Sequence, residues 1–275
     1  MRSLKKSIPH VFLMGYLLII LYPFLFVLFS SVKTDNQAIA ANPFGLPSSF
    51  QLDNYVNAWV NAKISTYFLN SLYIGVLAAC LSILFAAMLA FAVTRLRFNK
   101  ISLIVFQLIL IGMLIPNNSL LLPIYGIMRR LDILDTHMSL ILPYVANAIP
   151  FSVIILAAFM RSLPGEIEEA AVMDGLGPTG LFFKMILPLT VPAIVTVFIV
   201  NFLGNWNEFL LANYFLSSEE LRTLPVGMVG FRDAYNTNYA QMSAGIVFSI
   251  LPVMIIYGIL QEKIIEGVTA GSVKG

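Results

Sequence analysis

Long apolar stretches separated by short polar segments dominate the chain. Six windows contain no Asp, Glu, Lys or Arg, and each exceeds the roughly 20 residues that a helix needs to cross the bilayer core: Ser7–Val32, Ile64–Thr94, Ile101–Met128, Thr136–Met160, Met185–Asn207 and Ala234–Gln261. Lipid offers backbone polar groups no water, so only helices or closed barrels can span it. Continuous apolar runs such as Ile101–Ile111 lack the alternation of barrel strands. The pattern predicts an all-α, polytopic membrane protein with six transmembrane helices.

We expect these helices to form a single transmembrane domain over residues 1–275. The expected spans lie near 11–31, 67–93, 102–124, 137–160, 187–207 and 242–261. A polar loop over 161–187 separates the fourth span from the fifth. The first span is expected to remain in the protein, because its apolar core, Val11–Phe29, exceeds the roughly 7–15 apolar residues of a signal peptide.

Composition supports a membrane protein and disfavours several other classes. Of the 275 residues, 59% are hydrophobic and 11% are charged, whereas soluble domains carry about 25% charged residues. A net charge of +2 without a dense basic run disfavours a nucleic-acid-binding protein. Cys80 is the only cysteine, so one chain can form neither a disulfide nor a cysteine metal site. His10 and His137 lie at span edges, and we predict no metal site from them.

The distribution of basic residues predicts the orientation, because lysine and arginine accumulate in short loops on the cytoplasmic side. With the N-terminus inside, the cytoplasmic set is Arg2, Lys5, Lys6, Arg95, Arg97, Lys100, Arg161, Lys184, Lys263 and Lys274, and the outer set is Lys33, Lys63, Arg129, Arg130, Arg222 and Arg232. The larger first set predicts that both termini face the cytoplasm, with the pair Arg129–Arg130 as the exception. The outer segments then lie near 33–66, 117–135 and 208–233, and the first of them is expected to be irregular and partly helical.

The cytoplasmic segment RSLPGEIEEAAVMDGLGPTGLFFK predicts two short helices joined by a turn. Ser162 is expected to cap the first helix and Pro164 to enter its first turn, while three glutamates place negative charge at its positive end. Gly175 or Gly177 can adopt the left-handed conformation that ends it. A second helix then returns to the membrane near Pro188. Such a helix–turn–helix suits docking to a partner, although a solvated surface helix without a partner would show the same propensities.

The same segment resembles the EAA loop of the membrane subunits of ATP-binding-cassette importers, which reads Glu-Ala-Ala, three residues, Gly, nine residues, Ile, one residue, Leu-Pro. The matching residues are Glu169, Ala170, Ala171, Gly175, Leu187 and Pro188, with Met185 in place of the isoleucine. Four further stretches, SSFQLDNYVNAW, YFLNSL, NFLGNWNEFLLA and QEKIIEGVTAGSVKG, look like the maltose-type carbohydrate permease family. Within that family the chain resembles the six-span member of a heterodimeric permease.

The resemblance implies a permease subunit in a bacterial or archaeal cell (inner) membrane, with no catalytic residues and no cofactor on this chain. ATP and Mg would bind to two separate ATPase subunits. The other partners would be a second homologous permease subunit, an extracytoplasmic substrate-binding protein and a carbohydrate. The first short helix would be a coupling helix that docks into the ATPase.

The residues that the resemblance assigns to ATPase docking are Glu169, Ala170, Ala171, Asp174, Gly175, Leu187 and Pro188. The tail, at Gly271, Lys274 and Gly275, would reach towards the ATPase dimer interface. The outer segment 217–242 would contact the binding protein, although by its sequence alone it is an ordinary structured loop.

A predicted substrate path lies in NFLGNWNEF, the most polar patch in a spanning window. Aromatic rings stack on sugar rings and amides bond hydroxyl groups, which favours Asn201, Asn205, Trp206, Asn207 and Glu208 as path residues. Asn117 and Asn118 are expected at a comparable level. An interfacial belt of Trp and polar groups would give the same pattern.

Other functions are less consistent with the sequence. Residues Gly175–Gly180 match G-x-G-x-x-G, but no predicted strand precedes them and Pro178 lacks a backbone donor, so we predict no nucleotide site. An ion-driven secondary carrier is disfavoured, because the spans contain almost no ionisable residue besides Glu208 at an edge. A membrane-embedded enzyme would need a catalytic constellation that no span contains. A permease for another solute, such as glycerol-phosphate, remains the nearer alternative.

Overall fold

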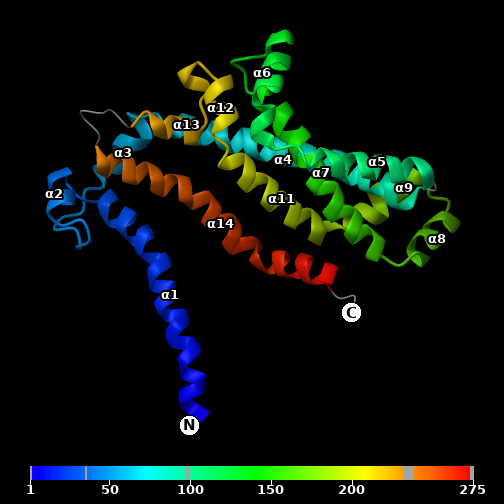
Figure 1. Ribbon diagram of the computed structural model, residues 1–275, viewed down its shortest axis with the longest axis horizontal. Coiled ribbons are helices and arrows are strands. Elements are labelled where there is room, and N and C mark those ends of the chain that lie inside the picture. Colours follow the sequence, from blue (N-terminus) through cyan, green and yellow to red (C-terminus); the bar gives the residue numbers. More distant parts are fainter. Residues whose placement is uncertain (1, 35, 97–98, 232–237, 273–275) are drawn as a thin grey trace. The chain divides into compact units, whose positions relative to one another are not determined.

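The computed structural model describes residues 2–34, 36–96, 99–231 and 238–272, and every regular element in these ranges is a helix (Figure 1). The all-α prediction is therefore confirmed for the described residues. The chain forms two compact units: unit 1 comprises residues 1–68 and 227–252, and unit 2 comprises residues 69–226 and 253–275. Helices α4 (Ile64–Arg95), α13 (Leu224–Val229) and α14 (Tyr239–Ser272) contribute residues to both units.

Unit 1 is organised around α3 (Asp53–Val60), which follows α1 (Arg2–Ser31) and α2 (Asn36–Ala41). The buried Asn54 side chain donates hydrogen bonds to the carbonyl oxygens of Ser31 at 3.0 Å and Lys33 at 2.9 Å, so it fastens the end of α1. The Trp59 ring contacts Phe248 of α14 at a centroid distance of 4.8 Å. These contacts attach α3 to α1 and to the first half of α14.

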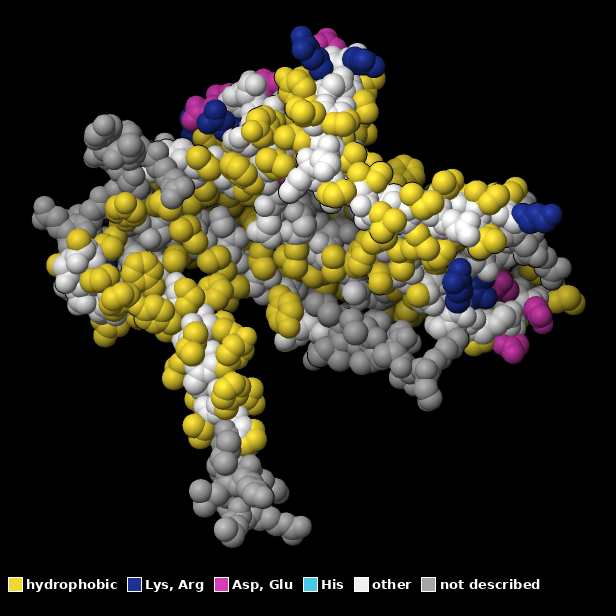
Figure 2. All heavy atoms as spheres, viewed as in Figure 1, with side chains coloured by type: hydrophobic (Ala, Val, Ile, Leu, Met, Phe, Trp, Pro, Cys, Tyr) yellow, Lys and Arg dark blue, Asp and Glu magenta, His cyan; other side chains and the backbone are white. Residues whose placement is uncertain are grey.

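Helix α1 exposes its apolar side chains. From Val11 to Leu25 every large apolar side chain is at least 41% exposed. Figure 2 shows the result as hydrophobic surface along the described part of this helix. Soluble monomers rarely expose apolar patches larger than a few hundred Å². The surface of α1 therefore requires lipid or another protein chain around it.

The core of unit 2 lies where α4, α7 (Met138–Ser162) and α11 (Val191–Trp206) pack together. Small side chains let helix backbones approach closely, which matters in lipid because no hydrophobic effect drives helix association there. Three alanines of α4 are completely buried in this core: Ala86, Ala87 and Ala90. The same cluster includes Leu156 of α7 and Val197 of α11, both without exposed surface.

Two of the expected spans are bent. Helix α5 (Asn99–Gly112) ends before Pro116, and the chain continues through η1 (Asn117–Leu120) into α6 (Leu121–Arg130) at an angle of 91°. The segment of α9 (Pro178–Leu181), η2 (Phe182–Ile186) and α10 (Leu187–Leu189) meets α11 at 75°. Proline removes a backbone donor and obstructs a continuing helix, and Pro188 and Pro192 flank this second bend. Within the described residues, four helices are long and apolar enough to cross a membrane, or up to six if each bent pair is one span.

A polar joint connects the loop before α7 to the chain after α12 (Leu210–Phe215), just before η3 (Glu219–Leu221). The Asp135 carboxylate accepts hydrogen bonds from the backbone N–H groups of Ser217 and Ser218, both at 2.8 Å, and from the Ser218 hydroxyl at 2.5 Å. These bonds stabilise the charged carboxylate, and the Ser218 hydroxyl contributes most. The pKa of Asp135 is therefore lowered from its ordinary value of 3.8.

We expect Asp135→Asn to lower the melting temperature of the detergent-solubilised protein at pH 7 by roughly 2–4 °C, as for a loss of about 1 kcal/mol. A lowered carboxylate pKa adds stability above the pKa of the unfolded chain, and this contribution is lost as the pH falls through the folded value. The difference from wild type should therefore shrink below pH 3.8.

Thermal unfolding at pH 7, at about pH 4 and at about pH 2.5 measures this difference. Asp132→Asn, on the same loop, is the control and should change the melting temperature little. A deficit for Asp135→Asn that stays undiminished at the lowest pH would contradict the role of the carboxylate charge.

Candidate functional site

Helix α8 (Glu166–Met173) is the first of the two short helices expected in the loop 161–187. Three glutamates occupy its first turn, where they complement the positive end of the helix dipole. The expected cap by Ser162 is wrong, because α7 continues through Ser162, whose hydroxyl donates to the Phe159 carbonyl at 2.7 Å. The N–H groups of Glu168 and Glu169 donate to the Gly165 carbonyl, and Pro164 lies outside the helix.

A glycine-dependent turn ends α8. Gly175 has φ = +82°, in the left-handed region that favours glycine, so this alternative of the predicted cap is confirmed. Gly177 is extended and precedes α9. The Gly175 N–H donates to the Val172 carbonyl at 2.9 Å and the Leu176 N–H to the Ala171 carbonyl at 3.0 Å. This pair of bonds is a Schellman motif, which fixes the direction in which the chain leaves the helix.

The outward side of α8 combines acidic and apolar side chains (Figure 2). Met173 is 86% exposed and Val172 is 58% exposed, although such side chains are usually buried. Five of the predicted docking residues are also exposed: Glu169, Ala170, Asp174, Gly175 and Pro188. Ala171 packs into the core instead, and Leu187, in α10, is partly buried. The helix therefore presents a small mixed surface that a complementary cleft could cover.

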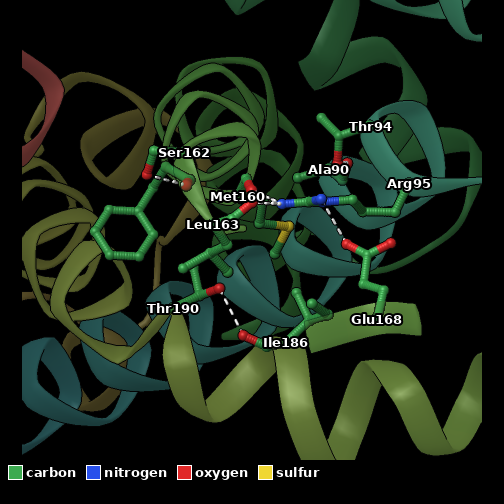
Figure 3. Close-up of polar contacts among 10 residues, drawn as sticks. Ala90, Thr94, Arg95, Met160, Ser162, Leu163, Glu168, Ile186 and Thr190 are labelled. Carbon is green, nitrogen blue, oxygen red and sulfur yellow. Dashed lines mark hydrogen bonds and ion pairs between the residues drawn. The ribbon is translucent and has the colours of Figure 1, made fainter. Parts of the chain in front are cut away.

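One arginine ties α8 to the ends of two long helices (Figure 3). The guanidinium of Arg95, the last residue of α4, donates to the carbonyl oxygen of Met160 and, at 3.0 Å, to that of Leu163. A terminal nitrogen lies 2.5 Å from Glu168 Oε1. The Arg95 and Glu168 side chains are only 12% and 20% exposed, so the ion pair is largely shielded from water. The side chain of another helix thus adds hydrogen bonds at the end of α7, where the Met160 carbonyl also accepts the N–H of Leu163.

The contacts of Arg95 with Met160, Leu163 and Glu168 are called the Arg95 clamp below. Apolar packing reinforces this clamp. Phe182 of η2 is buried and contacts Phe91 of α4 at a centroid distance of 5.3 Å. Leu181 and Ile186 are buried in the same cluster, together with Ala171 of α8. The two short helices are therefore a continuation of the core of unit 2.

A polar cavity of about 360 Å³ lies among η1, α7, α11 and α12. It brings together three of the predicted path residues, Asn201, Asn205 and Glu208, with Asn117 and Asn118 as expected at the same level. Asn147 and Phe151 of α7 also line it. Asn201 and Asn205 are spaced i and i+4 on one face of α11, and Glu208 reaches the cavity from the chain between α11 and α12.

The other two predicted path residues do not line this cavity. Trp206 is 2% exposed and stacks on Phe202 at a centroid distance of 5.6 Å. Asn207 is exposed, and its amide donates to the Leu203 carbonyl at 2.8 Å. The i, i+4 spacing of Asn201 and Asn205 was the signal in the sequence that separates them from Trp206 and Asn207.

Two of the cavity residues also hold helices together. The Asn201 amide donates to the hydroxyls of Ser82 at 3.0 Å and Ser152 at 2.9 Å, which joins α11 to α4 and α7. The Glu208 carboxylate accepts bonds from the Tyr144 hydroxyl at 2.6 Å and from the N–H groups of Leu211 and Ala212 at 2.7 and 3.1 Å. Glu208 thereby caps the first turn of α12 and attaches it to α7.

The sequence prediction missed the Arg95 clamp and Tyr144. One signal was available for the clamp, since RLRFNK and GEIEEAAVM carry opposite charges and were both assigned to the same side of the membrane. Of the predicted tail residues, Gly271 falls within α14, and Lys274 and Gly275 lie outside the described residues. Residues 232–237 of the outer segment 217–242 also lie outside them.

Comparisons with known proteins agree on one family. The family model described as "Binding-protein-dependent transport system inner membrane component" matches residues 82–269. The chain is 36% identical to the diacetylchitobiose uptake system permease protein NgcG of Streptomyces coelicolor, over 97% of this chain and 88% of that protein. It is 35% identical to the sulfoquinovosyl glycerol transport system permease protein SmoH of Agrobacterium fabrum, over 93% of this chain and 89% of that protein.

The fold also resembles a solved structure. A chain in the crystal structure of a bacterial ABC transporter involved in the import of the acidic polysaccharide alginate superposes with a TM-score of 0.84. The match covers 94% of this chain and 96% of that chain at 24% sequence identity. At this identity the likeness establishes a shared fold.

We expect Gly175→Val to destabilise the turn after α8 by about 1–2 kcal/mol, because a β-branched residue cannot readily adopt the left-handed conformation. No heavy atom lies within 4 Å of the position that a Cβ would take at Gly175 or at Gly165. The effect should therefore come from the backbone alone. Hydrogen exchange of the α8 amides should accelerate roughly 5–30-fold.

Gly165→Val is the matched control, because Gly165 has an equally open environment but φ = −69°. It should leave the exchange of the last turn of α8 nearly unchanged. Equal acceleration in both variants would show that the left-handed turn is not what holds this end of α8.

Proposed function

Because this chain belongs to the family of binding-protein-dependent transport system inner membrane components, we propose that it is a permease subunit of an ATP-binding-cassette importer for a carbohydrate. A family member of this kind is a membrane transport subunit and not an enzyme, and the ATPase is a separate subunit. The similarity to permeases for diacetylchitobiose and sulfoquinovosyl glycerol supports a carbohydrate rather than glycerol-phosphate as the solute. Membership of the family also removes the support for an ion-driven carrier.

The geometry of α8 supports the proposed permease function most directly. A helix that docks into a foreign cleft needs an exposed surface and a rigid base. Exposed Met173 and Val172 supply apolar contact, and Glu169 and Asp174 supply charges that can pair with basic groups. The Arg95 clamp and the buried Ala171 attach the helix rigidly to the core of unit 2. We therefore assign α8 as the helix that docks into the ATPase, with Leu187 and Pro188 shaping the return to the membrane.

The proposed assembly contains a second homologous permease subunit, two ATPase subunits and an extracytoplasmic substrate-binding protein. In it, α8 and both termini face the cytoplasm, and the tail at Gly271, Lys274 and Gly275 approaches the ATPases. The outer segment 217–242 faces the binding protein. The distribution of basic residues supports this orientation.

The proposed mechanism is alternating access driven by the ATPases. When the ATPase subunits close, they move α8, and the Arg95 clamp passes this movement to the ends of α4 and α7. Packed helices move as rigid bodies rather than deforming continuously. The cavity lined by Asn205 and Asn147 would then open to alternate sides of the membrane.

We expect Arg95→Ala to reduce the amount of sugar taken up per ATP hydrolysed by roughly tenfold in the reconstituted importer, because α8 could then move without α4 and α7. Arg95→Lys keeps the charge but loses the planar fork that reaches two carbonyls, so it should restore only part of the coupling. Glu166→Ala removes a carboxylate from the same turn as Glu168 and is the control. A wild-type ratio in an assembled Arg95→Ala importer would contradict the proposed role of the clamp.

The function itself is tested in proteoliposomes. Uptake of a radiolabelled oligosaccharide should require this chain, the second permease, the ATPase subunits and the binding protein together. Glu169→Lys should weaken co-purification of the ATPase by roughly tenfold or more, because it reverses a charge on the docking surface. The matched Glu166→Lys tests whether the position on α8 matters. Uptake by this chain in the absence of any ATPase would contradict the proposed function.

A further inference from the structure

Three amides of the polar cavity are available to a ligand. The side chains of Asn117, Asn118 and Asn147 make no hydrogen bond to other described residues. Each carries a carbonyl acceptor and two N–H donors. Asn205 uses one N–H for a long contact of 3.4 Å to the Gly75 carbonyl and keeps its own oxygen free. A sugar hydroxyl both donates and accepts, so these amides match it in either role.

Glu208 gives the same cavity a fixed negative charge. Both of its oxygens already accept hydrogen bonds from Tyr144 or from backbone N–H groups of α12. These donors are neutral, so they hold the carboxylate in place without cancelling its charge. Glu208 therefore acts on a ligand mainly through its charge and not as a free acceptor.

Among the described residues, the cavity lining contains no Lys, Arg or His to balance that charge. Proteins recognise carboxylates, phosphates and sulfonates mainly through charged arginine and lysine side chains. An anion entering this cavity would lose water, gain no cation and approach a carboxylate. A neutral solute would meet amides and the apolar ring of Phe151.

We propose that this cavity admits neutral, hydroxyl-rich solutes and excludes anionic ones, with Glu208 as the residue that determines the selection. The inference rests on the proposed function, since it assigns a solute class to the transport path. It goes beyond that function, because family membership leaves the charge of the solute open: the structural relative belongs to an importer of an acidic polysaccharide.

The test measures charge selection in the cavity directly, without the binding protein choosing the solute. In the assembled importer, Cys80→Ser removes the only cysteine of this chain, Asn147→Cys places a thiol in the cavity, and labelling is read on this chain alone. Reaction rates are measured with a cationic and an anionic methanethiosulfonate of similar size. Each rate is divided by the rate of the same reagent with 2-mercaptoethanol.

The normalised rate with the cationic reagent should exceed that with the anionic reagent by about tenfold or more, since Coulomb interactions in a cavity are screened less than in water. Glu208→Gln should bring the ratio close to one. Ser162→Cys, on the same helix but outside the cavity, is the matched control, and its ratio should not respond to Glu208→Gln. Equal normalised rates for the two reagents at Asn147→Cys would overturn the proposal. A ratio that does not change on Glu208→Gln would also overturn it.

A second measurement covers the case in which Glu208→Gln does not assemble, because Glu208 also caps α12. Raising the salt concentration from about 20 mM to about 500 mM should lower the ratio at Asn147→Cys and at a second cavity position, Asn118→Cys. A ratio of one at both positions and at low salt overturns the proposal. ATP-dependent oligosaccharide uptake, measured on the same preparations with native Asn147, separates the two failures. Intact uptake with no charge selection contradicts only this inference, whereas loss of uptake from the native importer contradicts the proposed function.

Discussion

The Arg95 guanidinium is the interaction on which the α8 end of unit 2 depends. It ends an apolar helix, where a largely buried cation has to find partners because the cost of leaving it unpaired is high. These partners are the carbonyl oxygens of Met160 and Leu163 at the end of α7 and the Glu168 carboxylate. The contact that satisfies the charge thus also positions α8. The ends of α4 and α7 and the start of α8 thus form one mechanical unit, so α8 stays attached while it exposes Met173.

The low water content of an apolar helix bundle explains which polar residues of unit 2 are structural and which are available to a solute. Asn201 forms hydrogen bonds with Ser82 and Ser152, and Glu208 forms them with Tyr144 and the first turn of α12. Such pairing is expected wherever lipid surrounds a helix bundle. Amides left without a partner gather at one cavity, where they face a space large enough for a ligand. Polar groups in the apolar part of the chain therefore form two sets: those that hydrogen-bond neighbouring helices and those that line the proposed solute path.

Much of this architecture could be predicted from local properties of the sequence. Charge-free windows predicted the long helices, and the glycines after an alanine-rich segment predicted a left-handed turn at Gly175 or Gly177, which Gly175 forms. The 91° bend at Pro116 was not predicted, because proline alone does not mark a bend and prolines also occur inside α7. The second short helix was expected to return to the membrane near Pro188, but the angle at which α11 follows it was not predicted. The clamp was missed because Arg95 and Glu168 are distant in sequence and meet only after α4 and α7 pack. Trp206 was chosen by residue type, whereas helix periodicity separates it from Asn201 and Asn205.

In the proposed mechanism, α8 and the ends of α4 and α7 move as one body when the ATPases close. Pulsed electron resonance can measure this movement with one spin label at Glu166 of α8 and another at Ala146 of α7, both exposed positions outside the proposed docking contact. In the complete importer, the distance distribution between these labels should be the same in the nucleotide-free and ATP-bound states. A shift of several ångströms between these states, in an importer that still transports, would show that α8 moves independently and would contradict the account.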